Sequence, residues 1–141
     1  MATLFVEPVQ SPHDMTRLKW HLRHFENVLF EQLGYGFDFA KDALGDLIAP
    51  SQRYQYQLQQ GFMPVLPLDK PDIALTGEQL LTWYQCLQDE ARFNQMMQQD
   101  FDLAKQLVNS ISAMHRHLMD NLLNYQTLQS RELWQQLTQY Q

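Results

Sequence analysis

The residues best suited to chemistry lie close together in the C-terminal half of the chain. His115, His117 and Asp120 fall within one short stretch, and imidazole and carboxylate groups are common metal ligands. A metal site between helices needs further ligands at helical spacing, yet the sequence contains no ExxH, HxxxE or HxxxH. We therefore expect His115 to be a buried, hydrogen-bonded core residue. The alternative is a ligand- or metal-binding helical bundle that uses His115 and its neighbours.

A cluster of basic residues near the N-terminus is a second candidate site. Its members are Arg17, Lys19, His21, Arg23 and His24. The cluster could dock an acidic partner or a phosphate, but three fixed cations are few for anion recognition, so we interpret it as a solvated helix face. The acidic positions Asp38, Asp42 and Asp46 receive the same interpretation, because they do not follow the pattern of a calcium loop.

Motifs of the common enzyme classes are absent from the sequence. It contains no P-loop, no GxGxxG, no HExxH and no GxSxG. Cys86 is the single cysteine, and its apolar surroundings in the sequence are more typical of a small core residue than of a nucleophile. We therefore predict a protein that is not an enzyme and binds no metal or cofactor.

The charge balance argues against nucleic acid as a partner. Ten Lys and Arg residues against sixteen Asp and Glu residues give a net charge of −6, which disfavours binding to a phosphate backbone. No apolar run approaches the roughly 20 residues of a membrane span, and the N-terminus lacks the pattern of a signal peptide. We expect a cytoplasmic protein without membrane contact, folded as one domain over residues 1–141.

Two periodic apolar patterns predict helices. Residues 76–129 contain no Pro and a single Gly near their start, and their second half has apolar residues at alternating steps of four and three, as on a packed helix face. This face comprises Met97, Phe101, Ala104, Val108, Ile111, His115, Leu118, Leu122 and Tyr125. A second helix, capped by Ser11 and ending near Leu33, has an apolar face comprising Met15, Leu18, Leu22, Phe25 and Leu29.

The other segments complete an expected all-α bundle of four to five helices. Residues 1–10 are expected to form an extended arm and residues 62–75 an apolar, proline-stiffened strap across the helices. A helix is expected over 37–48, with Phe37, Ala40, Leu44, Leu47 and Ile48 inward, another is an option over 51–60, and a short one is expected over 130–140.

The length of the 76–129 segment requires a further expectation. One straight helix of that length would span about 80 Å, whereas a compact domain of this size has a radius of gyration of about 14 Å. Either the helix breaks, and we place a break between Arg92 and Asp100, or it projects and pairs with another chain. The surplus apolar length predicts a homodimer with part of this segment at the interface.

Because the sequence argues against an enzyme, a metal site and a nucleic-acid partner, protein recognition is the function that remains. Methionine side chains are flexible and suit adaptable apolar grooves, and the C-terminal segment adds large apolar residues. The expected partner-binding residues are Met96, Met97, Met114, Met119, Trp134, Leu137 and Tyr140. The sequence thus predicts a protein-interaction module, an adaptor, chaperone or inhibitor that binds another protein.

Overall fold

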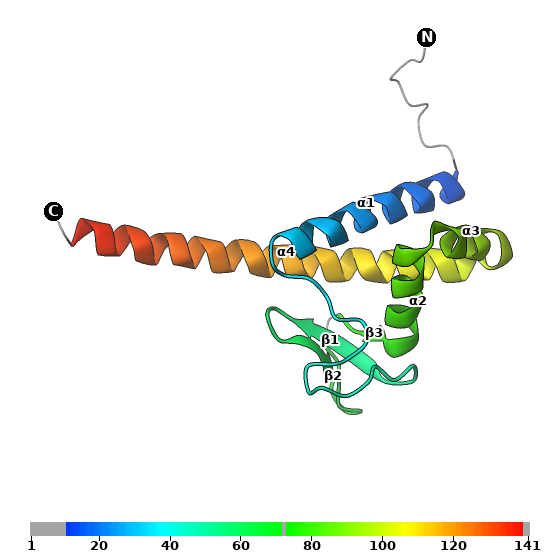
Figure 1. The fold of residues 1–141 in the computed structure, drawn as a ribbon, viewed down its shortest axis with the longest axis horizontal. Coiled ribbons are helices and arrows are strands. Elements are labelled where there is room, and N and C mark those ends of the chain that lie inside the picture. Colours follow the sequence, from blue (N-terminus) through cyan, green and yellow to red (C-terminus); the bar gives the residue numbers. More distant parts are fainter. Residues whose placement is uncertain (1–10, 72, 140–141) are drawn as a thin grey trace, which may run out of the picture.

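The long helix α4 organises the molecule in the computed structural model, which describes residues 11–71 and 73–139. In chain order the elements are α1 (Pro12–Gln32), β1 (Arg53–Gln57), β2 (Gly61–Pro64), β3 (Leu75–Thr76), α2 (Gly77–Gln88), α3 (Glu90–Gln99) and α4 (Phe101–Thr138). Figure 1 shows α1 lying along the N-terminal half of α4, with α2, α3 and the strands around that same half. The expected arm over 1–10 lies outside the described residues.

Helix α1 begins and ends where the sequence predicts, but it buries a different face. The hydroxyl of Ser11 accepts a hydrogen bond from the backbone N–H of Asp14 at 3.1 Å, which is the N-cap expected there. The residues that α1 buries are Thr16, Trp20, Asn27 and Phe30. The predicted apolar face is wrong, because four of its five members are exposed to solvent: Met15, Leu18, Leu22 and Phe25.

A three-stranded antiparallel sheet in the order β2-β1-β3 shows that the all-α prediction is wrong. Tyr54 and Tyr56 of β1 are both buried while their neighbours along the strand are not. This alternation is the period of a strand with one face on the core, so the optional helix over 51–60 is wrong as well. Tyr54 pairs with Pro64 of β2 on one side and Leu75 of β3 on the other.

The helix predicted over residues 37–48 is also wrong, because aspartate side chains hold this segment in turns. The Asp38 carboxylate accepts hydrogen bonds from the backbone N–H groups of Ala40 and Lys41, and Asp42 does the same for Leu44 and Asp46. Such local bonds offer the backbone an alternative to a helix. In consequence Leu44 and Leu47, which were expected inward, are exposed.

The strap predicted over 62–75 is partly strand. It supplies most of β2 and the first residue of β3. Phe62, Val65 and Leu75 are buried, whereas Leu66 and Leu68 are exposed.

The 76–129 segment is divided by two aspartates that cap the helices after them. The Asp89 carboxylate accepts from the N–H of Ala91, and that of Asp100 accepts from the N–H of Leu103. The predicted break between Arg92 and Asp100 corresponds to the second of these, and the first was missed. The separate helix predicted over 130–140 is wrong, since α4 continues without interruption to Thr138.

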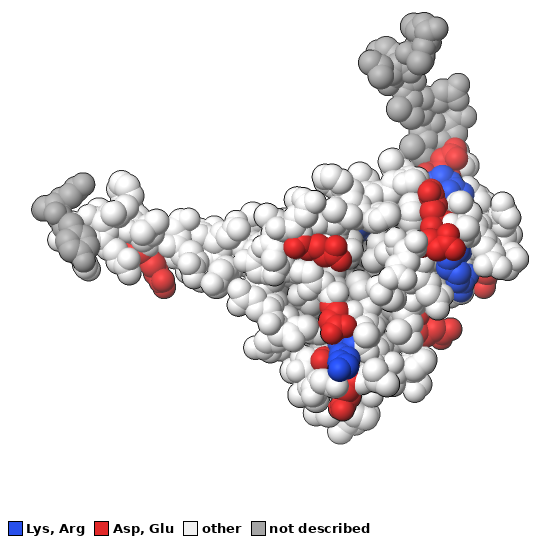
Figure 2. Space-filling view, viewed as in Figure 1, with Lys and Arg blue, Asp and Glu red and all other residues white. Residues whose placement is uncertain are grey.

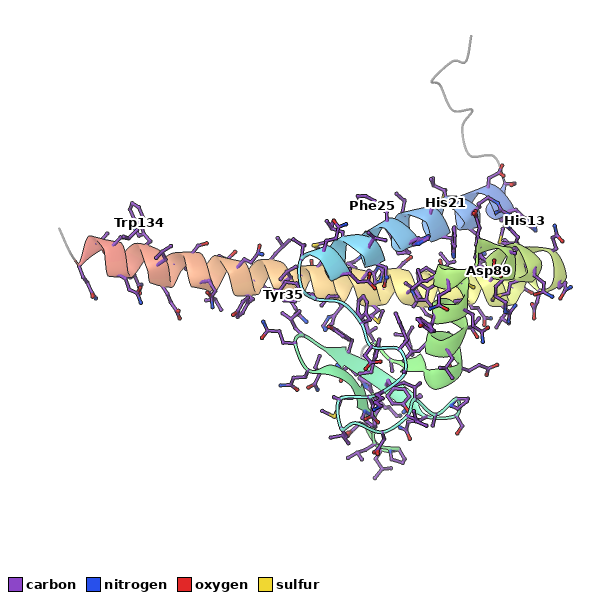
Figure 3. All side chains as sticks on the ribbon, in the orientation of Figure 1. His13, His21, Phe25, Tyr35, Asp89 and Trp134 are labelled. Atoms are coloured by element: carbon purple, nitrogen blue, oxygen red, sulfur yellow. The ribbon has the colours of Figure 1, made fainter. Side chains whose placement is uncertain are left out.

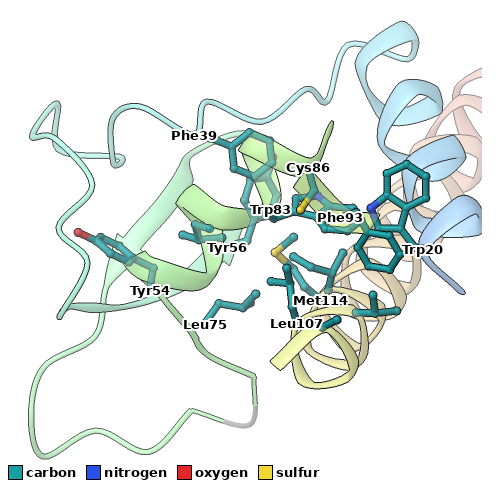
Figure 4. Packing of buried hydrophobic residues seen from close by; sticks show 14 of the residues in the cluster. Trp20, Phe39, Tyr54, Tyr56, Leu75, Trp83, Cys86, Phe93, Leu107 and Met114 are labelled. Carbon is teal, nitrogen blue, oxygen red and sulfur yellow. The ribbon is translucent and has the colours of Figure 1, made fainter. Parts of the chain in front are cut away.

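The core forms where α4 meets α1, α2, α3 and the sheet. Figure 4 shows large rings packed with aliphatic and sulfur-containing side chains, including Trp20, Trp83 and Phe93. On α4 the predicted face is buried from Ala104 to Leu122. Beyond that point α4 projects from the body (Figure 1). Within the part of the chain that the structure describes, no helix is long and apolar enough to cross a membrane.

Candidate functional site

A charged network joins α1 to α4 at the centre of their contact. The Nδ1 atom of His115 lies 2.9 Å from Oε1 of Glu26, and Nε of Arg23 lies 2.7 Å from the same oxygen. The Nη2 of Arg23 donates to the other oxygen, Oε2, at 3.1 Å. Arg23 therefore holds the carboxylate by one charge-assisted hydrogen bond and one close ion-pair contact. His115 is 2% exposed, so its predicted burial and hydrogen bonding to a facing helix are confirmed.

Burial and hydrogen bonding shift the pKa values of this network. Burial lowers the pKa of His115, and the hydrogen bond and charge of Glu26 oppose that effect without cancelling it. For Glu26, burial acts to raise the pKa, but the hydrogen bond to His115 and the charge of Arg23 outweigh it and lower the pKa overall. The neutral imidazole and the charged carboxylate are thus the favoured forms near neutral pH.

A row of basic residues lies along the line where α1 and α4 meet, and we call this line the groove. The Nζ of Lys19 lies 3.4 Å from Oδ1 of Asn109, and Nη1 of Arg23 donates to Oγ of Ser112 at 3.0 Å. The next positions on the same face of α4, four residues before Asn109 and four after Ser112, are Lys105 and Arg116. We call these four cations, Lys19, Arg23, Lys105 and Arg116, the basic row.

A hollow of about 230 Å³ opens at one end of the basic row. Arg23 and Arg116 line it together with Glu26, His115 and Asp120. The lining includes two arginines and two carboxylates, so its formal charge is balanced and the hollow suits a small polar group that accepts from the arginines. Arg17, by contrast, turns towards α3 and donates to Oδ1 of Asn94. The basic cluster of the sequence is therefore split, and its remaining cations are joined by two from α4.

The residues expected to bind a partner are scattered. Met96, Met97 and Met114 are buried in the core, and Met119 is half-buried. Trp134 and Leu137 are exposed on the projecting part of α4, and Figure 3 shows Trp134 pointing away from the helix. Tyr140 lies outside the described residues. Met96 nevertheless lines a hollow of about 210 Å³ formed by α2, α3 and α4, whereas Met97 and Met114 lie within the core.

The other candidate residues do not assemble into a reactive site. Among residues 11–71 and 73–139 no group of three or more His, Cys, Asp or Glu residues could hold a metal ion. The ring of His117 pairs with the Nδ2 of Asn121 at 3.2 Å rather than joining His115. Cys86 is buried, and desolvation raises the pKa of its thiol to about 11, which keeps it protonated and unreactive.

Comparison with known proteins relates most of the chain to proteins of DNA repair. It is 32% identical over 114 residues to the DNA repair protein RecO of Psychromonas ingrahamii, a match that covers 80% of this chain and 43% of that protein. The RecO proteins of Pseudoalteromonas translucida and Pasteurella multocida are 34% and 31% identical, over 80% and 85% of this chain and 42% and 44% of their own lengths. The chain thus spans less than half the length of these relatives. No family model matches it.

The similarity overturns two expectations. An adaptor, chaperone or inhibitor of a partner protein is the wrong class, because the relatives are named for DNA repair. The exclusion of nucleic acid is wrong for the same reason. It rested on the net charge of the whole chain, and a sum over 141 residues does not reveal that cations from two distant segments share one groove. One feature of the sequence could have indicated the basic row. Lys105 and Arg116 are eleven residues, or three helical turns, apart, so they lie on one face of a helix.

Proposed function

We propose that this chain acts in DNA repair and that it contacts single-stranded DNA along the basic row. The observation that carries the proposal is the similarity of four fifths of the chain to DNA repair protein RecO. The shared name specifies a process and no reaction, which supports a role in binding rather than catalysis. We place that role in the cytoplasm.

The geometry of the groove supports a single strand over a duplex. The basic row provides four cations within about 16 Å of helix α4, at 1.5 Å per residue. Firm binding to a duplex draws on more phosphate contacts than that, whereas a flexible single strand can follow a short charged groove. Arg116 is exposed beside the hollow and provides planar donors that can hold one phosphate.

The salt dependence of binding tests the proposal. The probe is a fluorescently labelled oligothymidylate, and its anisotropy is followed with increasing protein at 50 to 200 mM salt, a range chosen for its strong effect on such complexes. Arg23 is engaged by Glu26 and Ser112, so three phosphate contacts, from Lys19, Lys105 and Arg116, predict a slope of log K against log salt of about −2. Because Lys105 and Arg116 are exposed, replacing both by Gln should leave the fold intact and make the slope shallower by about 1.4.

A matched pair of cations controls for total charge. Lys41→Gln with Lys70→Gln removes the same charge from exposed positions in the loops near the sheet, and this double variant should bind as the unchanged protein does. If both double variants weakened oligothymidylate binding equally, the attraction would be diffuse and the basic row would not be a binding site. Absence of salt-dependent binding to oligothymidylate would reject DNA contact through this groove.

A further inference from the structure

A second hollow, of about 290 Å³, lies on a different face of α1. It is bounded by α1 residues that include Asn27 and Glu31, by the loop after α1, and by α2. Asn27 and Glu31 are four residues apart and so lie on one face of the helix. This hollow shares no lining residue with the one beside the basic row, and the inference below goes beyond the proposed function.

Aromatic rings form one wall of this second hollow. The ring centroids of Phe37 and Phe39 are 5.6 Å apart, and those of Phe39 and Tyr84 are also 5.6 Å apart. Phe39 is buried and Phe37 packs on Phe62 and His115, so the wall is anchored to the core. Tyr84 is 41% exposed. Its ring therefore offers an accessible face, and such faces attract cations.

Two polar residues of α1, Asn27 and Glu31, also line this hollow. Asn27 is 4% exposed, and its Oδ1 has no hydrogen-bond partner among the described residues. Buried amide oxygens normally have one, and a half-turn of the amide can present either its oxygen or its nitrogen to the hollow. Glu31 is exposed and its carboxylate makes no ion pair with any described residue. The hollow is thus lined by a carboxylate without an ion pair among the described residues and by an amide whose buried oxygen has no partner there.

The charge around the hollow favours a cation. The chain carries a net charge of −6. On the face shown in Figure 2, acidic side chains lie near the C-terminal end of α1 and over the loop and strands below it, with few basic ones among them. A nucleic-acid strand would be repelled here, whereas a positively charged side chain would be attracted.

We propose that this hollow binds an arginine side chain from a basic segment of another protein. A guanidinium group is planar, so it can stack on the exposed face of Tyr84 while donating to acceptors in its own plane. The acceptor exposed at the hollow is the carboxylate of Glu31, and a half-turn of the buried Asn27 amide would add its oxygen. Lysine carries the same charge but has no plane to stack, and it makes a poorer fit to two acceptors and a ring.

A titration followed by NMR tests the arginine site directly. The probe is Nα-acetyl-arginine amide, whose only charge is the guanidinium, added at millimolar concentrations to the isotopically labelled full chain. The side-chain amide of Asn27 and the backbone amide of Tyr84 should shift and saturate. Glu31→Gln, at an exposed position that the fold does not need, should weaken binding roughly fivefold. Glu132→Gln, a matched change on the projecting part of α4, should not.

The remaining probes separate this proposal from its rivals. The corresponding citrulline amide, a neutral analogue of the same shape, should bind at least tenfold more weakly than the arginine amide. Asn27→Leu should weaken arginine binding and leave the fold intact, because it replaces a buried amide whose oxygen has no partner by an apolar group of the same branched shape, beside an open hollow.

The guanidinium assignment would be overturned if the citrulline amide bound as tightly as the arginine amide. It would also be overturned if Nα-acetyl-lysine amide, whose side-chain amine is charged, bound as tightly. Indifference to Glu31→Gln, or stronger shifts of the same signals by oligothymidylate, would overturn it as well. The arginine titration itself contains no DNA, so failure of arginine amide to bind would leave the basic row and the role in repair untouched.

Discussion

The imidazole Nδ1 of His115 and the carboxylate Oε1 of Glu26 lie 2.9 Å apart and connect α4 to α1. The same oxygen lies 2.7 Å from Nε of Arg23, so one carboxylate binds a buried histidine and a member of the basic row together. The stability of the α1–α4 pair and the charge of the proposed DNA groove therefore depend on the same three side chains.

Acid should destabilise the protein in two stages. The folded pKa of His115 lies below its usual value of 6.5, so the unfolded chain takes up a proton first as the pH falls below about 6.5, and stability is lost there. The folded pKa of Glu26 lies below 4.5, so a second loss begins as the pH falls below about 4.5. Urea unfolding between pH 2.5 and pH 8 measures both.

The variant His115→Leu tests whether His115 causes the loss of stability that begins near pH 6.5. Leucine cannot take up a proton, so the part of the stability loss that begins near pH 6.5 should shrink, while the free energy of unfolding at pH 7.5 changes by only about 1 to 2 kcal/mol. An unchanged pH profile in this variant would show that His115 titrates alike in the folded and unfolded chains.

Removing the negative charge beside Arg23 should strengthen DNA binding. Glu26→Gln keeps the size of the side chain but leaves Arg23 free to contact phosphate, so oligothymidylate affinity at 100 mM salt should rise roughly three- to fivefold. Anisotropy measures the affinity, and Glu132→Gln, which removes the same charge far along α4, serves as the control. Equal gains in affinity in both variants would show that the effect depends only on net charge.

The aspartate caps that divide the 76–129 segment should each contribute to stability. Asp100→Ala removes the acceptor of the Leu103 N–H and should lower the free energy of unfolding by about 1 kcal/mol. Asp102→Ala, two residues on and exposed, removes a charge near the same helix end but no cap, and should cost less. Urea unfolding measures the stability of both variants. Equal losses in the free energy of unfolding would show that the cap does not stabilise α4.

The buried and projecting parts of α4 should respond differently to truncation. Ile111 is fully buried and Leu133 is 57% exposed. Ile111→Ala should cost about 3 kcal/mol of stability, while Leu133→Ala should change it by less than about 0.5 kcal/mol. Chemical denaturation measures both, and a large loss at Leu133 would show that the projecting part is covered in solution.

Helix faces could be predicted from the sequence only where one pattern dominated. On α4 the apolar period continues through Val108, Ile111 and Leu118, and the structure buries it. On α1 the more regular pattern of Leu18, Leu22 and Phe25 faces solvent, because two bulky rings on another face have partners elsewhere in the chain. Trp20 stacks on Phe93 of α3 at 4.8 Å. Periodicity identifies an apolar face but not what covers it.

The sheet and the basic row were missed because both depend on contacts distant in sequence. The Tyr54–Tyr56 alternation is a strand signal, but it is short and lies among polar residues. Lys19 meets Asn109 and Arg23 meets Ser112 across about ninety positions of the chain, and no local pattern predicts such pairs. The His115–Glu26 bond is of the same kind, which is why the sequence predicted a buried histidine but not its partner.

Survival after DNA damage tests the central claim most directly. Deleting the coding sequence of this chain from the organism that encodes it, then counting viable cells after ultraviolet irradiation, should show survival reduced at least about tenfold. The unchanged coding sequence and the Lys41→Gln/Lys70→Gln variant should restore survival, and the Lys105→Gln/Arg116→Gln variant should not. Survival of the deletion strain equal to that of its parent would contradict a role in DNA repair.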